Sequence, residues 1–329
     1  MEGGRRYRFS FAPYQREMME TPFDPSVQMT VFQLASRLGK TETAMNILGH
    51  CIDCAPRKIL ALYPTTSQAE KWSKETLEKE LLAPTPSLRF LERGGRRDSS
   101  NTILHKLFPG GLINVFGGNA PGELRRSKGN LLFADEIDAL QSSENDEGDQ
   151  LEIFWTRGSI AASYPSVEGR SRISQLLATS DCRKWHTPCI HCGKEYVMLR
   201  EHLQYPEGKP KLAVLVCPEC GEGITDKQRK EMVMNGRWIA TRPFTGIAGF
   251  HGNGLLNPHP TQRGYDCHLH WIASQEEKIE KSDSPDRARH VLTNTFDAEP
   301  YKPEVVEAPN ANALLDRVEE YKPREELPD

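Results

Sequence analysis

An eight-residue run, LASRLGKT at positions 34–41, has the residue types of a phosphate-binding P-loop. Such a loop needs backbone N–H groups around phosphate oxygens, a lysine that reaches the β- and γ-phosphates, and a hydroxyl for Mg²⁺. Gly39, Lys40 and Thr41 supply these parts, although Leu34 replaces the first glycine of the motif. For the tripeptide alone, a surface turn is the alternative. The apolar run before it and the helix-compatible run after it favour the P-loop.

Two adjacent carboxylates follow a second apolar run. Residues 131–134 are Leu-Leu-Phe-Ala, and Asp135 and Glu136 come directly after them. Ligands bind at the carboxyl edge of open parallel sheets, and a buried strand here would deliver both acids to that edge. We expect Asp135 to hold Mg²⁺ together with Thr41, and Glu136 to polarise the attacking water. Paired acids are also common in loops, so the catalytic interpretation depends on the P-loop upstream.

An aromatic residue and a glutamine precede the P-loop. The ring of Tyr14 could stack on adenine, and the amide of Gln15 could bond the edge of the base. The alternative is the start of an amphipathic helix with Tyr14 in the core. The candidate nucleotide-binding residues are therefore Tyr14, Gln15, Ser36, Arg37, Leu38, Gly39, Lys40 and Thr41.

Four of the eight cysteines are spaced as metal ligands. They form two C-x-x-C-G sequences, Cys189 with Cys192 and Cys217 with Cys220. The pattern predicts a tetrahedral four-thiolate Zn²⁺ site in a ribbon, and a closed thiolate set predicts a structural metal. The glycine after each pair permits the positive φ of a knuckle turn. Cys51 and Cys54 have no partner pair, and we expect His191 to be exposed and not to be a ligand.

Two further features have both a functional and a plain structural interpretation. Arg125 and Arg126 stand in a glycine-rich loop, where they could contact a neighbour's nucleotide or DNA phosphate, or simply form an exposed turn. Ser163 ends the strand-like run 157–163, and its hydroxyl could sense the γ-phosphate and couple its loss to a DNA-gripping element. A serine at a strand end is otherwise a turn former.

The composition is that of a globular protein. The chain has 329 residues, 37% of them hydrophobic, and no apolar run approaches the ~20 residues that cross a bilayer. No apolar segment follows the first arginines, so we expect neither a signal peptide nor an anchor, and a cytoplasmic protein. The net charge of −4 argues against a protein coated in nucleic acid, although local basic clusters could still follow phosphates.

The elements that would position these residues alternate between strands and helices. Apolar runs predict parallel strands at 27–32, 58–63 and 131–136, a hairpin at 103–108 and 112–116, and helices at 42–54 and 66–82. This alternation indicates an α/β fold with a mostly parallel sheet. Further helices are expected at 227–235, 267–281 and 285–294. Residues 246–260 are rich in Gly, His, Asn and Pro, and we expect them to be irregular.

Together, the motifs and their order resemble those of the lambda-like (GpA) large terminases of phages. The residues that carry the resemblance are Pro13 to Glu17, Ala35 to Thr41, Tyr63 to Thr65, Asn101 to Lys106, Phe108 to Gly111, Gly117 to Pro121, Leu124 with Arg125, Asp135 with Glu136, Ser171 to Ile173, and Asn294 to Phe296 with Glu299. The order of these motifs is far more specific than any one of them.

The resemblance implies a RecA-like P-loop NTPase with an inserted zinc ribbon and a small helical C-terminal subdomain. We expect the ATPase core at 1–181, the ribbon at 182–225, the helical or lid subdomain at 226–300, and at 301–329 an acidic linker toward a nuclease domain that this chain lacks. Nuclease activity is therefore not expected. The family also replaces the first P-loop glycine freely and tends to carry an arginine in the loop, so Arg37 is implied to act on the γ-phosphate beside Lys40 and Glu136.

The implied function is the ATPase motor that translocates double-stranded DNA into a procapsid. Its implied cofactors are ATP, Mg²⁺ and a structural Zn²⁺. Its implied partners are DNA, the small terminase subunit, the portal or procapsid, and further copies in a ring, in the cytoplasm of the infected bacterial host. Where many relatives have Ser-Thr-Pro, this chain has Ser163-Tyr164-Pro165. Two other functions stay open: a helicase-like or remodelling ATPase, and a zinc-ribbon nucleic-acid binding module with a silent ATPase site.

Overall fold

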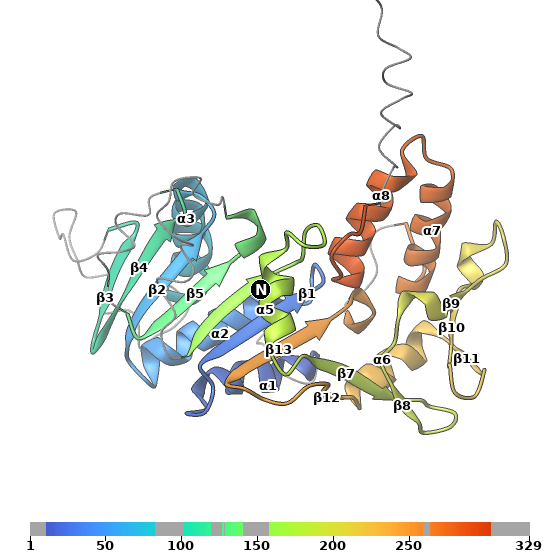
Figure 1. The fold of residues 1–329 in the computed structure, drawn as a ribbon, viewed down its shortest axis with the longest axis horizontal. Helices are drawn as coiled ribbons and strands as arrows, with labels where there is room; N and C mark the ends of the chain where they lie inside the picture. Colours follow the sequence, from blue (N-terminus) through green and yellow to red (C-terminus); the bar gives the residue numbers. More distant parts are fainter. Residues whose placement is uncertain are drawn as a thin grey trace, which may run out of the picture.

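The core of the fold is a ten-stranded sheet. The computed structural model describes residues 11–82, 102–119, 127, 129–140, 158–258 and 264–303. Across the sheet the strands are β12 (Arg237–Ala240), β7 (Arg183–Pro188), β13 (Ile247–Gly252), β1 (Met29–Leu34), β6 (Ser159–Ser163), β5 (Leu131–Asp135), β2 (Lys58–Tyr63), β4 (Gly111–Gly117) and β3 (His105–Phe108), and β8 (Glu195–Tyr196) pairs with β7 (Figure 1).

The strands from β7 to β4 run parallel to one another. Among the described strands of this sheet, β12 and β8 pair antiparallel to β7, and β3 pairs antiparallel to β4, near the two edges. All six residues of β1 are buried, as is typical of a strand with neighbours on both sides and cover on both faces. The expected α/β class with a mostly parallel sheet and the expected hairpin before residue 117 are therefore confirmed.

Helices cover both faces of the sheet. On one face α1 (Tyr14–Glu20), α2 (Lys40–Asp53) and α3 (Thr66–Trp72) share a core with Phe32, Leu34 and Phe133. On the other face α5 (Arg172–Thr179) packs over β1, β13 and β6. The helix expected at 66–82 exists, but its second part, Ser73–Leu82, has π-helical bonding. Side chains alternate between the two faces of the sheet along each strand, so Leu34, Phe133 and Tyr63 lie on the face that α2 covers.

Two expectations about the second half of the chain are wrong. Residues 246–260 are not all irregular, because they contain β13, which pairs with β1 over six residues. Its apolar run is short, and the glycines around it hide the strand pattern. Gly249 is required here because a Cβ at this position would collide with Ser180. Glycines inside a strand reduce its sequence signal, because they often mark places where another part of the chain approaches closely.

The domain boundaries expected from the sequence do not match the sheet. Strand β7 lies in the range 182–225, and β12 and β13 lie in the range 226–300, yet all three belong to the central sheet. The core is therefore discontinuous in sequence, and 226–300 is not only a helical subdomain. Its helices are α6 (Asp226–Met234), α7 (His268–Glu280) and α8 (Pro285–Leu292), near their expected positions. None of the helices in the described ranges is long and apolar enough to cross a membrane.

Between β7 and β12 the chain forms a small separate unit. Three short strands, β9 (Leu203–Gln204), β10 (Val214–Val216) and β11 (Gly223–Ile224), make an antiparallel sheet next to the two cysteine pairs. Figure 1 shows this unit beyond the β12 edge, below the α7–α8 hairpin. Strands of two or three residues bury little apolar area, so this unit needs another source of stability.

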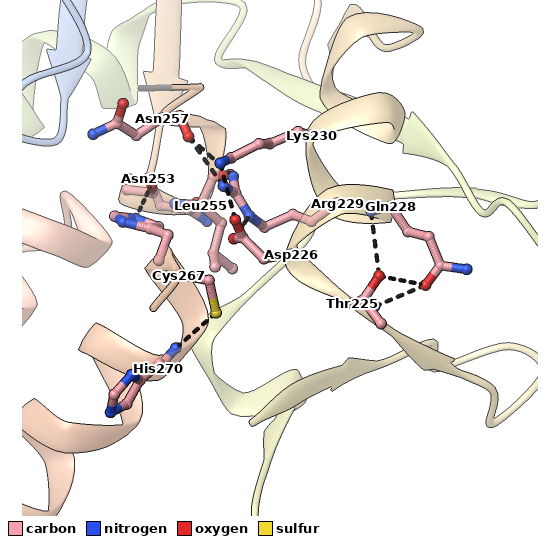
Figure 2. A network of polar contacts seen from close by, with 12 residues as sticks. Thr225, Asp226, Gln228, Arg229, Lys230, Asn253, Leu255, Asn257, Cys267 and His270 are labelled. Carbon is pink, nitrogen blue, oxygen red and sulfur yellow. Dashed lines mark hydrogen bonds and ion pairs between the residues drawn. The ribbon is translucent and has the colours of Figure 1, made fainter. Parts of the chain in front are cut away.

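A buried arginine connects α6 to the segment that follows β13. The Arg229 side chain is fully buried, its Nε donates to Asp226 Oδ1 at 2.9 Å, and Nη1 and Nη2 donate to the Asn257 carbonyl at 3.2 and 3.1 Å. Nη1 also donates to the Leu255 carbonyl. Figure 2 shows the guanidinium between these partners. The charge is buried but fully paired, which is the condition under which such a group is tolerated.

We expect Arg229→Met to lower the free energy of unfolding by about 3–5 kcal/mol, because it leaves Asp226 Oδ1 and two buried carbonyls without the donor that pairs with them. The matched control is Lys230→Met. Lys230 bonds the same Asp226 at 3.1 Å, but its side chain is 36% exposed. Its loss should cost at most about 1 kcal/mol. Urea unfolding measures both, and equal losses would contradict this account.

Candidate active site

The P-loop candidate lies at the carboxyl edge of the sheet, between the end of β1 and the start of α2. Gly39 has φ of 79°, and Arg37 has φ of 65°. A Cβ on Gly39 would also collide with the Gln15 side chain, so both the turn and the close approach require glycine here. The expected strand, loop and helix are therefore present, with the N-terminus of α2 directed at the loop as an anion site requires.

Contacts from distant parts of the chain hold this loop in place. The Ala35 N–H donates to the Gly252 carbonyl at 2.8 Å, and the Ser36 N–H donates to the Thr295 carbonyl at 2.7 Å. Gln15 Nε2 donates to the Leu38 carbonyl at 2.7 Å. The loop without a first glycine is thus shaped by its neighbours: β13, the segment after α8, and α1.

Tyr14 and Gln15 contact the loop and not a nucleotide base in this geometry. Tyr14 is 1% exposed, begins α1, and donates from its hydroxyl to the Leu38 carbonyl at 3.2 Å. Its ring packs edge-on against Trp185. A buried ring has no face open to adenine, so the expected stacking of Tyr14 does not fit, and the alternative of a core tyrosine at a helix start describes the structure. Gln15 also bonds the loop, and its expected contact with the base stays a prediction.

Lys40 is the first residue of α2 and lies against the loop. Its Nζ donates to the Leu34 carbonyl at 2.8 Å and to the Ala35 carbonyl at 3.2 Å. The Tyr164 ring centroid is 5.9 Å from the same atom. Burial lowers the pKa of Lys40 to about 8, against the opposing effect of Asp135 and Glu136. The ammonium group is therefore short of water, a state in which an anionic ligand is bound strongly.

Asp135 and Glu136 lie at the same edge as Lys40. Strand β6 separates β1 from β5, and the three are in parallel register, so their carboxyl ends align. Asp135 is 7% exposed, and burial, then the charge of Glu136, raise the pKa of Asp135 to about 6. Glu136 is exposed, with φ of 51°, and its N–H donates to Asp135 Oδ1 at 3.0 Å. The two acids thus differ in environment: one is buried beside the lysine, and the other faces solvent.

Ser163 ends β6 at this edge. Its Oγ donates to the Tyr164 carbonyl at 2.8 Å and receives the Asp138 N–H at 3.5 Å. Asp138 Oδ2 accepts from the Ser166 N–H at 2.7 Å, and its Oδ1 accepts from the Ile173 N–H at 2.8 Å. Sequence reasoning assigned no role to Asp138. It connects the turn after the two acids to the loop after β6 and to the start of α5.

Two more residues that the sequence analysis did not single out support the P-loop strand. Gln33 Nε2 donates to the Ala298 carbonyl at 2.8 Å, and His251 Nε2 lies 3.1 Å from the same oxygen. His251 Nε2 is also 3.3 Å from Glu299 Oε1. Burial lowers the pKa of His251, so its imidazole is neutral near pH 7. The only signal available in sequence was a glutamine inside an otherwise apolar buried strand.

The other expected site residues fall into two groups. Ser36, Arg37 and Thr41 are exposed at the loop and the start of α2, where a ligand can reach them. Arg125 and Arg126 lie outside the described residues, so their expected role stays a prediction.

The four expected metal ligands come together. Their sulfur atoms all lie within 4.8 Å of one another, and Cys189 Sγ is 3.9 Å from Cys220 Sγ. Zn–S bonds of 2.3 Å in a tetrahedron place sulfur atoms about 3.8 Å apart, so the set fits Zn²⁺. Both knuckles repeat one backbone pattern, in which Gly193 N–H donates to the Cys189 carbonyl and Gly221 N–H donates to the Cys217 carbonyl. Both glycines have the positive φ that we expected.

His191 is not part of this cluster. Its side chain is exposed, and its Nε2 lies 3.2 Å from the Gly223 carbonyl. Cys51 and Cys54 lie at the end of α2, and within the described residues neither joins a group that could hold a metal. The expected exposure of His191 is confirmed.

Comparison with known proteins gives one family. The model of the phage terminase large subunit gpA, ATPase domain, matches residues 3–238. The terminase large subunit of Enterobacteria phage P21 is 23% identical over 95% of this chain and 52% of its own length. That of Escherichia phage lambda is 21% identical over the same shares. The chain thus spans about half the length of these curated relatives.

Among solved structures, the ATPase domain of the Thermus phage P74-26 large terminase is similar to this chain. It is 13% identical and covers 90% of this chain and 100% of its own, with a TM-score of 0.43.

Proposed function

This chain belongs to the family of the phage terminase large subunit gpA ATPase domain, and from that premise we propose that it hydrolyses ATP at the 34–41 loop and couples hydrolysis to translocation of double-stranded DNA into a procapsid. The observation that carries the proposal is the meeting of Lys40 with Asp135 and Glu136 at one edge of a parallel sheet. A lysine at a helix start facing two acids across one strand is the arrangement that Mg²⁺-dependent phosphoryl transfer needs.

Each residue then has a defined task. Lys40 would leave the Leu34 and Ala35 carbonyls to bind the phosphates, and Thr41 and Asp135 would hold Mg²⁺. Bound Mg²⁺ would neutralise charge on the phosphate oxygens. Glu136, exposed beside buried Asp135, is the residue free to accept the proton of the attacking water. Arg37, exposed in the loop, would face the γ-phosphate.

Coupling would pass from the two acids to α5. Asp138 binds the Ser166 and Ile173 N–H groups, and Ser163 contacts Asp138. A change at Glu136 on loss of the γ-phosphate would therefore shift the loop after β6 together with α5. Tyr164, next to Lys40, takes the position at which relatives carry threonine, so here an aromatic ring would sense the occupied site.

The same family membership also supports proposals about the fold of the core, the metal and the partners. The core would be RecA-like, and the four cysteines would hold a structural Zn²⁺ that shapes a ribbon. Partners would be DNA, the small terminase subunit, the portal or procapsid, and other copies in a ring in the cytoplasm of the infected host. Arg125 or Arg126 would contact a neighbour's nucleotide or DNA. This chain would cleave no DNA, and metal-dependent nicking by the purified chain would refute that.

Lys40→Ala tests the site directly. We expect loss of detectable ATP turnover with DNA present, because the only side chain placed to neutralise the phosphates from α2 is removed. Lys71→Ala, an exposed helical lysine on α3, is the matched control and should leave turnover unchanged. Turnover that persists in Lys40→Ala would reject the site.

Two alternatives predict different results. A helicase-like or remodelling ATPase would separate strands or displace bound protein without a procapsid. A zinc-ribbon binding module with a silent site would bind nucleic acid and show no Lys40-dependent turnover even with DNA and procapsid.

A further inference from the structure

Tyr63 lies on the strand next to the two acids, and none of the catalytic roles proposed for the site uses its side chain. It is the last residue of β2, which pairs with β5 in parallel register up to Leu62 and Ala134. The next residues along the two strands are Tyr63 and Asp135. Figure 1 shows β2 and β5 side by side, with α2 behind them. Tyr63 and Phe133 belong to the same core cluster, and side chains alternate along a strand, so Tyr63 and Asp135 face the same side of the sheet as α2.

The Tyr63 hydroxyl is buried without a partner. The residue is 6% exposed, and among the described residues its OH has no hydrogen-bond partner. Its ring packs against two other aromatic rings: the Tyr63 ring centroid is 5.0 Å from that of Trp72 and 6.3 Å from that of Phe133. A phenylalanine would pack equally well there. A buried hydroxyl with no acceptor costs about 1–3 kcal/mol, so its presence requires another reason.

The backbone around Tyr63 holds the side chain where it is. The Gly118 N–H donates to the Tyr63 carbonyl at 2.7 Å. Asn119 Oδ1 accepts from the Thr66 N–H at 3.0 Å and fixes the turn that follows. Strand β2 lies between β4 and β5, and Trp72 of α3 packs on the Tyr63 ring, so the hydroxyl atom is buried. A partner for this hydroxyl would therefore lie inside the site.

We propose that the Tyr63 hydroxyl binds an ordered water molecule that hydrogen-bonds the Asp135 and Glu136 carboxylates, and thereby positions these acids for the reaction. The hydroxyl makes no direct bond to either acid, and one water spans such a gap at little cost. A phenol is protonated at neutral pH and donates to this water, which donates to the carboxylates. Tyr63 is thus a positioning residue, and this role rests on the ATPase function proposed above.

A different explanation places the water between Tyr63 and Trp72 alone. The Trp72 Nε1 atom is also buried without a partner among the described residues. A water shared only by these two donors would stabilise the core and would have no effect on the chemistry. Thermal stability and turnover separate the two explanations.

The test compares Tyr63→Phe with wild type in the full chain, with ATP, Mg²⁺ and DNA. We expect kcat to fall about tenfold, because a lost hydrogen bond to charged groups is worth about that factor, while KM for ATP stays within roughly twofold. The melting temperature should not fall, because the removed hydroxyl has no partner in the protein. Tyr196→Phe is the matched control: its OH is also buried and unpartnered among the described residues, and it lies on β8 away from this edge, so its kcat should equal that of wild type.

A second readout needs no turnover. In a Glu136→Gln background we would measure ATP binding with Mg²⁺ and with EDTA, and Tyr63→Phe should reduce the Mg²⁺-dependent gain in affinity roughly three- to tenfold. Unchanged kcat and unchanged gain would overturn the proposal. A lower melting temperature with unchanged kcat would also overturn it, in favour of the water shared with Trp72. If wild type binds ATP but never hydrolyses it, the proposed function fails, whereas this binding readout still decides the role of Tyr63.

Discussion

Replacing Glu136 with glutamine should lower ATP turnover by a factor of at least about 100 while ATP binding persists. The factor is the lower end of what a positioned general base contributes. Glutamine keeps the size of the side chain and cannot take a proton. Lys40 bonds the loop through the Leu34 and Ala35 carbonyls, and these bonds do not involve Glu136. Binding should therefore survive the change, and hydrolysis should not.

The measurement is a pair of assays on the same preparation: phosphate release with DNA present, and equilibrium binding of ATP with Mg²⁺. Glu70→Gln is the matched control, since the Glu70 side chain on α3 is 44% exposed and forms an ion pair with Lys74 at 3.5 Å. It should leave both quantities unchanged. Turnover near the wild-type value in Glu136→Gln would mean that another group activates the water, and loss of binding would mean that Glu136 holds the loop.

Local sequence pattern was enough to predict where the candidate site residues lie in the fold. Gly39 and Lys40 follow a buried strand and begin a helix, and Asp135 ends another strand, so their neighbours in sequence reveal where they lie. The cysteine pairs are a similar case, because two short spacings and one metal geometry leave few arrangements. Each of these predictions used only the residues close to it in the sequence.

What holds the site together could not be found in this way. The loop is shaped by the Gly252 carbonyl and the Thr295 carbonyl, which are more than two hundred residues away and act through their backbone. Every residue has a backbone carbonyl, so the residue type does not show which carbonyl will accept a bond from the loop. Tyr14 illustrates the opposite error: an aromatic ring near a P-loop fits adenine by type, but its burial under Trp185 is decided by tertiary packing.

The segment after α8 contacts both β1 and the 34–41 loop. The Thr295 carbonyl binds the loop at Ser36, and the Ala298 carbonyl binds Gln33 of β1. Arg200, from the small unit between β7 and β12, bonds Asp297 at 2.7 Å. The expected core, ribbon and helical parts are therefore joined by hydrogen bonds and an ion pair close to the 34–41 loop.

Removing zinc should have the second large effect, and it should be confined to the small unit. Its strands are two or three residues long, while a structural Zn²⁺ site contributes about 10–16 kcal/mol of binding free energy in isolated zinc-finger peptides. We expect one Zn²⁺ per chain by elemental analysis and its loss in Cys217→Ser. Cys217 is 1% exposed, so the change also places an unpaired hydroxyl in the core of the unit.

Limited proteolysis between residues 189 and 224 should then become fast, while the sheet keeps its own contacts and unfolds at nearly the wild-type denaturant concentration. Arg200 pairs with Asp297 in the segment after α8, and Arg237 of β12 pairs with Glu195 of β8. Neither pair needs the metal. Cys54→Ser is the matched control, because Cys54 is exposed and outside the cluster; it should keep the zinc. Full zinc content in Cys217→Ser, or slow proteolysis after its loss, would show that packing and not the metal holds the unit.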